Sequence, residues 1–301
     1  MDTVLISGGT GLIGRNLAAR LKEKGYNAAF LSRNFKPTAG FPAYHWDPDK
    51  SEIDSAAISD ADYIIHLAGA NIGEKWWTKE RRKLILESRI KSGDLLLRSL
   101  SGNSNKLKAF ISASAVGYYG AITSDKIFCE EDPPCDDFLG ETCRKWEQSA
   151  DRFEEIGIRT VKIRTGVVLS RHGGALAKMA VPVRMGFGSA LGNGKQYIPW
   201  IHIEDLCNIY IRALEDSKIE GAYNAVAPDN RTNKDFTRSL AFSMRKPFWF
   251  PNIPAIVLKA IFGEMSAVLL KGSRVSSGKI MSAGFSFKFP DLENALNDLF
   301  R

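Results

Sequence analysis

The chain has 301 residues, of which 44% are hydrophobic and 25% are charged, and its formal net charge is +7. These proportions are typical of a globular protein, and the length predicts one large α/β domain or one domain with a smaller cap. No stretch approaches the ~20 uninterrupted apolar residues of a membrane-spanning helix. The first residues, Met1–Thr3, lack the charged and apolar regions of a signal peptide. We therefore expect a cytoplasmic protein without a membrane partner.

The four cysteines and four histidines do not have the spacing of a metal site. The cysteines, at positions 129, 135, 143 and 207, never lie two residues apart, so we expect reduced thiols and no bound metal. The positive charge could attract nucleic acid, but the longest basic cluster, residues 79–83, includes a glutamate and has no accompanying aromatic platform. A field that attracts anionic cofactors and substrates explains the charge. We expect no nucleic-acid partner, and an oligomer stays an open alternative.

Short apolar strands alternate with helical patterns through the first half of the chain. Strands are predicted at 4–6, 28–31, 63–65, 109–111 and 160–169, and helices at about 13–24, 78–100 and 138–155. Continuous apolar runs separated by helices are typical of a parallel sheet covered on both faces. The pattern predicts an α/β fold with a Rossmann-type doubly wound sheet over residues 1–169. Residues 170–301 are predicted as mostly a smaller substrate-capping region, with a return to the sheet near 198–228.

Glycines stand at positions 8, 11 and 14, between the first predicted strand and the first predicted helix. A bound pyrophosphate needs a tight turn, a backbone that it can approach closely, and a helix N-terminus with free N–H groups. A glycine triplet alone is a weak signal, but here it has the strand–turn–helix context that this chemistry needs. The residues predicted to line the pyrophosphate are Gly8, Thr10, Gly11, Leu12, Ile13 and Gly14.

The end of the second predicted strand favours NADP(H) over NAD(H). An NAD-binding protein usually has a carboxylate ~20 residues after the turn, where it holds the ribose 2′-hydroxyl. This chain has Ser32 and Arg33 there and no acidic residue. The arginine can pair with a 2′-phosphate and stack on adenine, and the serine can donate to the same phosphate. The alternative is a surface arginine at a strand end. We predict NADP(H) as the cofactor.

Several longer segments resemble one protein family over essentially the whole chain. They include the glycine turn at 7–14, LAGA at 67–70, YYG at 118–120, RTGVVL at 164–169 and PWIH at 199–202. This pattern is similar to the extended short-chain dehydrogenases/reductases, the group of sugar-nucleotide epimerases and dehydratases. Within that group the chain resembles the atypical proteins called epimerase-family or cell-division-inhibitor-like. The resemblance implies a nicotinamide dinucleotide cofactor and a small-molecule substrate.

The resemblance extends the predicted cofactor path beyond the glycine turn. The segment 67–69 would pass under the adenine ribose with its backbone only. Position 112 lies near the carboxyl end of a predicted strand, where ligands bind in open α/β sheets. The arginine at position 89 could approach the dinucleotide from the long helix, although an exposed helix arginine is an equally good interpretation. The further residues predicted to contact the cofactor are Leu67, Ala68, Gly69, Arg89 and Ser112.

The catalytic pair of that family is missing. Most members carry Tyr-x-x-x-Lys on the helix that follows the strand predicted here at 109–111. There the lysine holds the nicotinamide ribose and lowers the pKa of the tyrosine. The aligned segment has Leu139 and Cys143 instead. The catalytic candidates are Ser114, Tyr118, Tyr119 and, as a second choice of acid or base, Glu141. We predict that one of the two tyrosines donates the proton and that the serine orients the substrate oxygen. The alternative is that the tyrosines only pack the wall of the site.

Two classes of function follow from these residues. The first is an NADP(H)-dependent oxidoreductase or epimerase that acts on a small carbonyl or hydroxyl compound, nucleotide-linked compounds included. The second is a non-catalytic NADP(H)-binding protein whose redox state governs a partner. The serine, the paired tyrosines and the cap favour the enzyme, whereas the missing tyrosine–lysine pair favours the second class. The fold does not decide between them, because one fold hosts many functions.

Overall fold

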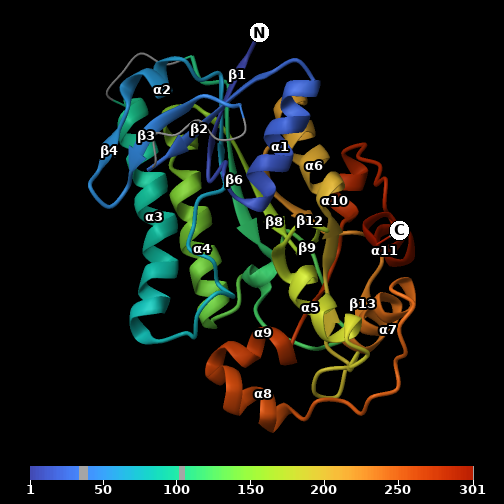
Figure 1. Ribbon diagram of the computed structural model, residues 1–301. Helices are drawn as coiled ribbons and strands as arrows, with labels where there is room; N and C mark the ends of the chain where they lie inside the picture. The colour runs from blue at the N-terminus through green and yellow to red at the C-terminus, as the bar shows by residue number, and fades with distance from the viewer. Residues whose placement is uncertain (34–39, 102–105, 301) are drawn as a thin grey trace.

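The computed structural model describes residues 1–33, 40–101 and 106–300, and its centre is an eight-stranded sheet (Figure 1). The strand order is β12-β8-β6-β5-β1-β2-β3-β4, and every neighbouring pair is parallel except β3 with β4. The strands are β1 Thr3–Ser7, β2 Asn27–Ser32, β3 Ala43–Asp47, β4 Glu52–Ile53, β5 Tyr63–His66, β6 Ala109–Ala115, β8 Arg159–Thr165 and β12 Gly221–Ala225. The predicted α/β fold with a Rossmann-type, mostly parallel sheet is confirmed.

Helices cover both faces of the sheet because its strands point apolar side chains to both sides. The covering helices are α1 Leu12–Glu23, α2 Ser55–Ser59, α3 Lys79–Ser101, α4 Phe138–Asp151 and α6 Ile203–Glu215. Val4 and Ile6 of β1 belong to one apolar core with α1 and α6. Leu5 belongs to a second core with α2, α3 and α4. Figure 1 shows α3 and α4 on one side of the sheet and α1 and α6 on the other.

The remaining elements form a smaller region next to the lower end of the sheet in Figure 1. Three further strand pairs are β7 Ile127–Phe128 with β14 Arg274–Val275, β9 Val167–Leu169 with β11 Trp200–His202, and β10 Tyr197–Ile198 with β13 Arg231–Thr232. The helices are α5 Gly174–Arg184, α7 Asn233–Ser243, α8 Ala255–Phe262, α9 Ala267–Leu270, α10 Gly278–Ser282 and α11 Leu292–Phe300, with single 3₁₀ turns η1 Val116–Tyr119, η2 Glu154–Ile156 and η3 Gly263–Ser266. Leu176, Leu240 and Leu296 join α5, α7 and α11 in a third apolar core.

Two strands at one edge of the sheet were not predicted from the sequence. The segments β3 and β4 have a half-buried pattern in which Trp46 is the one fully buried residue. They lack the continuous apolar run that marks the central strands, because an edge strand is covered less completely. The long predicted strand at 160–169 is also divided, into β8 and β9. The division falls at Gly166, where an added Cβ would lie 2.6 Å from the Pro199 carbonyl oxygen.

The second half of the chain contributes to the sheet inside the range 198–228. There β12 pairs with β8, and α6 packs beside α1 in the same apolar core. The helix predicted at 138–155 ends earlier, at Asp151, and a 3₁₀ turn follows. Among the residues that the structure describes, no helix has the length and apolar character needed to cross a bilayer.

Candidate functional site

The predicted cofactor residues gather at the carboxyl edge of the parallel sheet. From β1 the chain moves outward through β2 to β3, and it then returns to the other side of β1 with β5, β6 and β8. The strand order therefore reverses between β1 and β5, and ligands of open α/β sheets bind in the crevice at such a switch point. The glycine turn follows β1, Ser32 ends β2, and Leu67 follows β5 directly. One half of a dinucleotide can lie on the β1–β2 side and the other on the β5–β8 side.

The turn after β1 accepts only glycine at two positions. Gly8 has a φ of +72°, and an added Cβ would lie 3.0 Å from the Ala68 nitrogen. A Cβ on Gly14 would lie 2.5 Å from the Gly9 Cα and 2.6 Å from the Gly8 oxygen. The Gly14 distances are too short for any side chain, and the positive φ of Gly8 would strain one there, so the turn packs backbone against backbone.

The N-terminus of α1 offers free N–H groups to an anion. The helix begins at Leu12, its N-cap Gly11 has no side chain to cap it, and no acidic residue lies in its first turn. Thr10 and Gly11 are exposed. An uncapped helix N-terminus preceded by a glycine turn fits a pyrophosphate. The donor set of this chain therefore fits a dinucleotide.

A buried histidine joins the glycine turn to the next strand. The Nδ1 atom of His66 lies 2.6 Å from the Ser7 Oγ, and its Nε2 atom lies 3.0 Å from the Ser92 Oγ of α3. Burial lowers the pKa of His66 to about 4, so the ring is neutral at pH 7. The Ala68 nitrogen donates to the Ser7 Oγ at 3.3 Å, and the Leu67 nitrogen donates to the Ser7 oxygen at 3.0 Å. This arrangement holds the segment 67–69 against Gly8, and no sequence pattern predicted it.

The other predicted cofactor residues differ in their exposure. Arg33 is exposed at the end of β2, and Ser32 beside it is half-buried. Arg89 is buried under the segment after β5 and donates to the Ala70 oxygen at 3.1 Å. It is therefore not the exposed helix arginine of the alternative interpretation. Ser112 is 1% exposed and donates to the adjacent Ala113 oxygen. This burial speaks against a contact between the Ser112 side chain and a cofactor.

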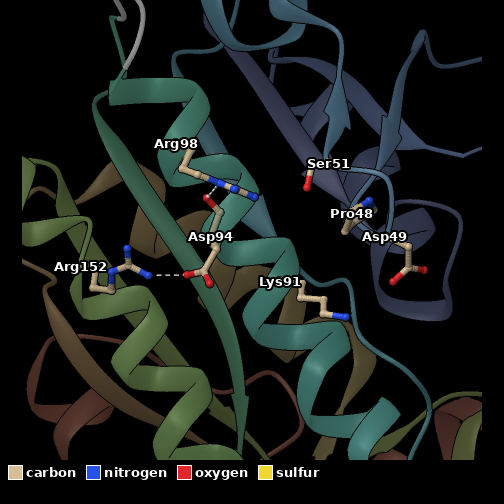
Figure 2. A pocket seen from close by; sticks show the side chains of 7 residues that line it. All are labelled: Pro48, Asp49, Ser51, Lys91, Asp94, Arg98 and Arg152. Atoms are coloured by element: carbon tan, nitrogen blue, oxygen red, sulfur yellow. Dashed lines mark hydrogen bonds and ion pairs between the residues drawn. The ribbon is translucent and has the colours of Figure 1, made fainter.

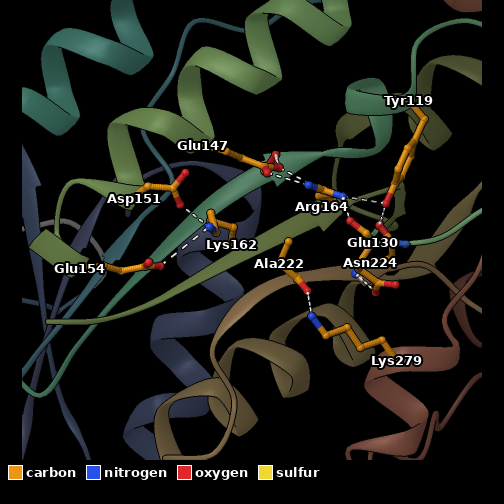
Figure 3. A network of polar contacts seen from close by, with 11 residues as sticks. Tyr119, Glu130, Glu147, Asp151, Glu154, Lys162, Arg164, Ala222, Asn224 and Lys279 are labelled. Atoms are coloured by element: carbon orange, nitrogen blue, oxygen red, sulfur yellow. Dashed lines mark hydrogen bonds and ion pairs between the residues drawn. The ribbon is translucent and has the colours of Figure 1, made fainter. Parts of the chain in front are cut away.

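A buried polar network lies where β6, α4 and β8 meet (Figure 3). Its centre is a two-point ion pair in which Arg164 Nε and Nη2 each lie 2.8 Å from an oxygen of Glu147. Ser114 Oγ donates to Glu147 Oε1 at 2.6 Å. The side chains of Glu147 and Arg164 are only 8% and 4% exposed. Such a pair is costly to break, because either partner alone would be a buried unpaired charge.

The two tyrosines of the candidate site have different surroundings. Tyr119 is 1% exposed, and its hydroxyl accepts from Arg164 Nη1 at 2.9 Å and donates to Asn224 Oδ1 at 2.8 Å. Burial raises the pKa of Tyr119. The hydroxyl proton of Tyr119 is therefore already donated to Asn224 within the network. This contact fits a packing residue better than a proton donor. Tyr118 keeps some exposed surface, and its ring lies 3.6 Å from the Arg164 guanidinium carbon.

The positions that replace the family tyrosine and lysine are closed and apolar. A Cβ built on Gly117 would lie 3.5 Å from Leu139 and 3.6 Å from the Cys143 sulfur, so both side chains face η1. Burial raises the pKa of the Cys143 thiol to about 12, which keeps it protonated. Glu141 was a second candidate acid, but it faces solvent, and its carboxylate lies 2.8 Å from Lys145. This exposed ion pair disfavours Glu141 as the acid or base, and its role stays a prediction.

A surface pocket of about 290 Å³ lies away from the predicted cofactor edge (Figure 2). It is lined by Pro48, Asp49, Ser51, Lys91, Asp94, Arg98 and Arg152. Arg98 and Arg152 lie near the carboxyl ends of α3 and α4. Helices that connect parallel strands run opposite to them, so these ends lie at the amino edge of the sheet. The described residues contain no group of three or more side chains that could hold a metal ion.

Known proteins match the chain along almost its whole length. Residues 4–225 match the NAD dependent epimerase/dehydratase family, and residues 253–299 match a domain of unknown function, DUF1731. The Epimerase family protein SDR39U1 of Mus musculus is 35% identical, covering 98% of this chain and 99% of that protein. The Epimerase family protein YfhF of Bacillus subtilis is also 35% identical, covering 98% of this chain and 97% of that protein.

A solved structure agrees with both the fold and the family. The crystal structure of human epimerase family protein SDR39U1 with NADPH has a TM-score of 0.87 and 33% identity, covering 99% of this chain and 98% of that one. The family resemblance in the sequence is confirmed. The chain belongs to the NAD-dependent epimerase/dehydratase family, as an atypical, SDR39U1-like extended short-chain dehydrogenase/reductase.

Proposed function

We propose that this protein binds NADP(H) across the switch point between β1 and β5. The glycine turn at 8–14 carries the proposal, because its geometry excludes side chains and leaves the N-terminus of α1 open to a pyrophosphate. Ser32 and the exposed Arg33 at the end of β2 would hold the 2′-phosphate, and the sequence has no acidic residue at positions 31–39. The NADPH bound to the human relative supports the choice of cofactor.

We further propose an oxidoreductase or epimerase that acts on a small carbonyl or hydroxyl compound, nucleotide-linked compounds included. Bound NADP(H) would supply or accept a hydride. Tyr118 is the candidate proton donor, because the hydroxyls of Ser114 and Tyr119 are engaged in the buried network. The phenol of Tyr118 is protonated at pH 7 and can donate to a substrate oxygen, but burial raises its pKa, which makes it a weaker acid than a tyrosine beside the family lysine. Ser114 and Tyr119 act as positioning residues that hold Glu147 and Arg164.

A second function is a non-catalytic NADP(H)-binding protein whose cofactor state governs a partner. The observation that favours it is the replacement of the family pair by Leu139 and Cys143. Both face η1, and the thiol keeps its proton, so neither side chain can take over a proton relay. The same cofactor site would serve both functions. They differ in whether the protein also binds and converts a second small molecule.

Mass spectrometry of the small molecules released from freshly purified protein tests the proposal. A stoichiometric second metabolite beside NADP(H) would support the enzyme and name its substrate class. NADP(H) alone would support the second function. With a substrate in hand, Tyr118→Phe is expected to abolish most turnover without changing the unfolding curve. Full turnover in Tyr118→Phe would remove that residue from the mechanism.

Tyr119→Phe is the matched control for the neighbouring ring. It removes a hydroxyl that contacts Arg164 and Asn224, so it is expected to lower the free energy of unfolding by about 1–3 kcal/mol. Turnover per folded molecule should change little. Urea unfolding followed by circular dichroism measures the first effect. If only Tyr119→Phe lost turnover, Tyr119 would be the proton donor and Tyr118 the positioning residue.

A further inference from the structure

Arg89 is a buried cation for which the described residues provide no carboxylate. Its side chain rises from the middle of α3 and is 9% exposed. Its Nη1 donates to two backbone carbonyl oxygens, of Ala70 at 3.1 Å and of Ile85 at 2.8 Å. Burial lowers the pKa of Arg89, and the nearby charge of Arg81 lowers it further. A buried charge is costly without full compensation, so a guanidinium that has carbonyl and ring contacts but no carboxylate is a candidate binding group for an anionic or hydroxyl-bearing ligand.

The guanidinium lies on the β5–β6 side of the switch point. A Cβ on Gly69 would lie 3.1 Å from the Arg89 Cζ, so the segment after β5 runs directly over it. From the other side it faces α4, where the Arg89 Cζ lies 4.6 Å from the Trp146 ring centre. Its charge also opposes the rise of the Cys143 pKa. The cation therefore stands beside the position at which the family carries its lysine.

We propose that Arg89 supplies, from α3, the positive charge that position 143 of α4 lacks, and that it donates to the nicotinamide ribose of bound NADP(H). The hydrogen bonds found for it come from Nη1, one of three nitrogens in a guanidinium with five N–H donors. The donors on the other two nitrogens have no partner among the described residues. The segment 67–69 was expected under the adenine ribose, but the Arg89 guanidinium also faces Trp146 of α4. That side lies beyond the switch point from the glycine turn, where the nicotinamide half of a dinucleotide binds. This inference rests on the proposed NADP(H) binding.

The test compares two ligands that differ in the nicotinamide half. NADPH contains both halves, whereas adenosine 2′,5′-bisphosphate contains only the adenosine and the 2′-phosphate. Arg89→Met is expected to weaken NADPH by roughly 10- to 100-fold, the range of a hydrogen bond to a charged group, and to leave the bisphosphate within twofold. Isothermal titration calorimetry measures both. Arg98→Met on the same helix, an exposed arginine at the opposite edge, is the matched control and should change neither.

The possible results distinguish a failure of the role of Arg89 from a failure of the proposed NADP(H) binding. Unchanged NADPH affinity in Arg89→Met, or equal weakening of both ligands, would overturn the role of Arg89. Wild-type protein that binds neither ligand would instead overturn the proposed cofactor. A double variant, Arg89→Met with Cys143→Lys, returns the cation from α4. This double variant is expected to bind NADPH at least tenfold more tightly than Arg89→Met alone. If Arg89 only stabilised the fold, the added lysine would not restore NADPH affinity.

If Arg89→Met does not fold, Arg89→Lys provides the same test. It keeps a positive charge on α3 with a single donor nitrogen in place of three. We expect a melting temperature close to that of the wild type, NADPH binding weakened about tenfold, and unchanged bisphosphate binding. Folded Arg89→Lys that binds NADPH as tightly as the wild type would contradict the proposal.

Discussion

At the β1–β2 half of the carboxyl edge, the polar groups offered to a ligand are backbone N–H groups and one exposed arginine. At the β6–β8 half they are side chains, and most of them are tied to one another. Gly8 and Gly14 leave no room for side chains. Across the switch point, Ser114 and Tyr119 turn their hydroxyls toward Glu147 and Arg164, inside the protein.

Cofactor binding and chemistry can therefore change independently in one crevice. A pyrophosphate site made of backbone depends on residues whose replacement would break the turn. A proton relay made of side chains can be lost while the network behind it stays intact, since Glu147 and Arg164 still pair beside Leu139 and Cys143. Variants of the glycine turn should therefore affect ligand binding, and variants of the buried Glu147–Arg164 network should affect stability.

In the β1–β2 half of the edge, the largest expected effect on NADPH affinity comes from Gly14→Ala. The added methyl would lie 2.5 Å from the Gly9 Cα, so the turn must open. We expect NADPH affinity to fall by roughly 100-fold or more, about 2.7 kcal/mol, as measured by calorimetry. Gly73→Ala is the control, because its Cβ would meet only the Asn71 side chain at 3.8 Å. Equal affinities of the two variants would break the assignment of the turn.

In the β6–β8 half of the edge, Glu147→Gln should lower the free energy of unfolding. Loss of the carboxylate leaves Arg164 as a buried, unpaired charge, so the free energy of unfolding should fall by about 3–5 kcal/mol. Glu141→Gln on the same helix changes an exposed carboxylate and should leave the unfolding curve unchanged. Urea unfolding compares the two variants. A small effect of Glu147→Gln would mean that the ion pair does not hold β8 to α4.

These two regions were not equally predictable from the sequence. The glycine turn was predictable because its backbone geometry requires one residue type at defined spacings, and both are written in the sequence. The network was not, because Glu147, Arg164 and Asn224 are ordinary residues until the fold brings α4, β8 and β12 together. The edge strands β3 and β4 were missed for a related reason, since their half-buried residues have no continuous apolar pattern.

A third effect concerns pH and the histidine behind the glycine turn. Burial holds the pKa of His66 at about 4, below the 6.5 of an exposed histidine, so the unfolded chain binds a proton first. Its contribution to stability is complete above pH 6.5 and is lost as the pH falls toward 4. The loss is about 3.5 kcal/mol, because the window spans about 2.5 pH units at about 1.4 kcal/mol each.

The matched variant for the pH effect is His66→Gln, which does not titrate. Its free energy of unfolding should fall less steeply than that of the wild type between pH 6.5 and 4. His202 also has a pKa lowered by burial, but it is present in both proteins, so the difference isolates His66. Parallel curves for the two proteins would show that His66 is not buried in its neutral form.

The smallest expected effect is on cofactor choice. Arg33→Ala should weaken NADPH roughly 10- to 100-fold, the range of a hydrogen bond to a charged group, and leave NADH unchanged. Arg98→Ala removes an exposed arginine at the opposite edge and should change neither affinity. Fluorescence titration with the two reduced cofactors measures both. Equal losses of NADPH and NADH in Arg33→Ala would remove the 2′-phosphate argument.

We propose the carboxyl edge of this sheet as an NADP(H) site. The most direct measurement is calorimetric titration of the wild-type protein with NADPH and with NADH. We expect one NADPH per chain, bound at least roughly tenfold more tightly than NADH, since the 2′-phosphate adds a charged contact. Equal affinities would contradict the role of Arg33, and no binding of either nucleotide would contradict the site itself.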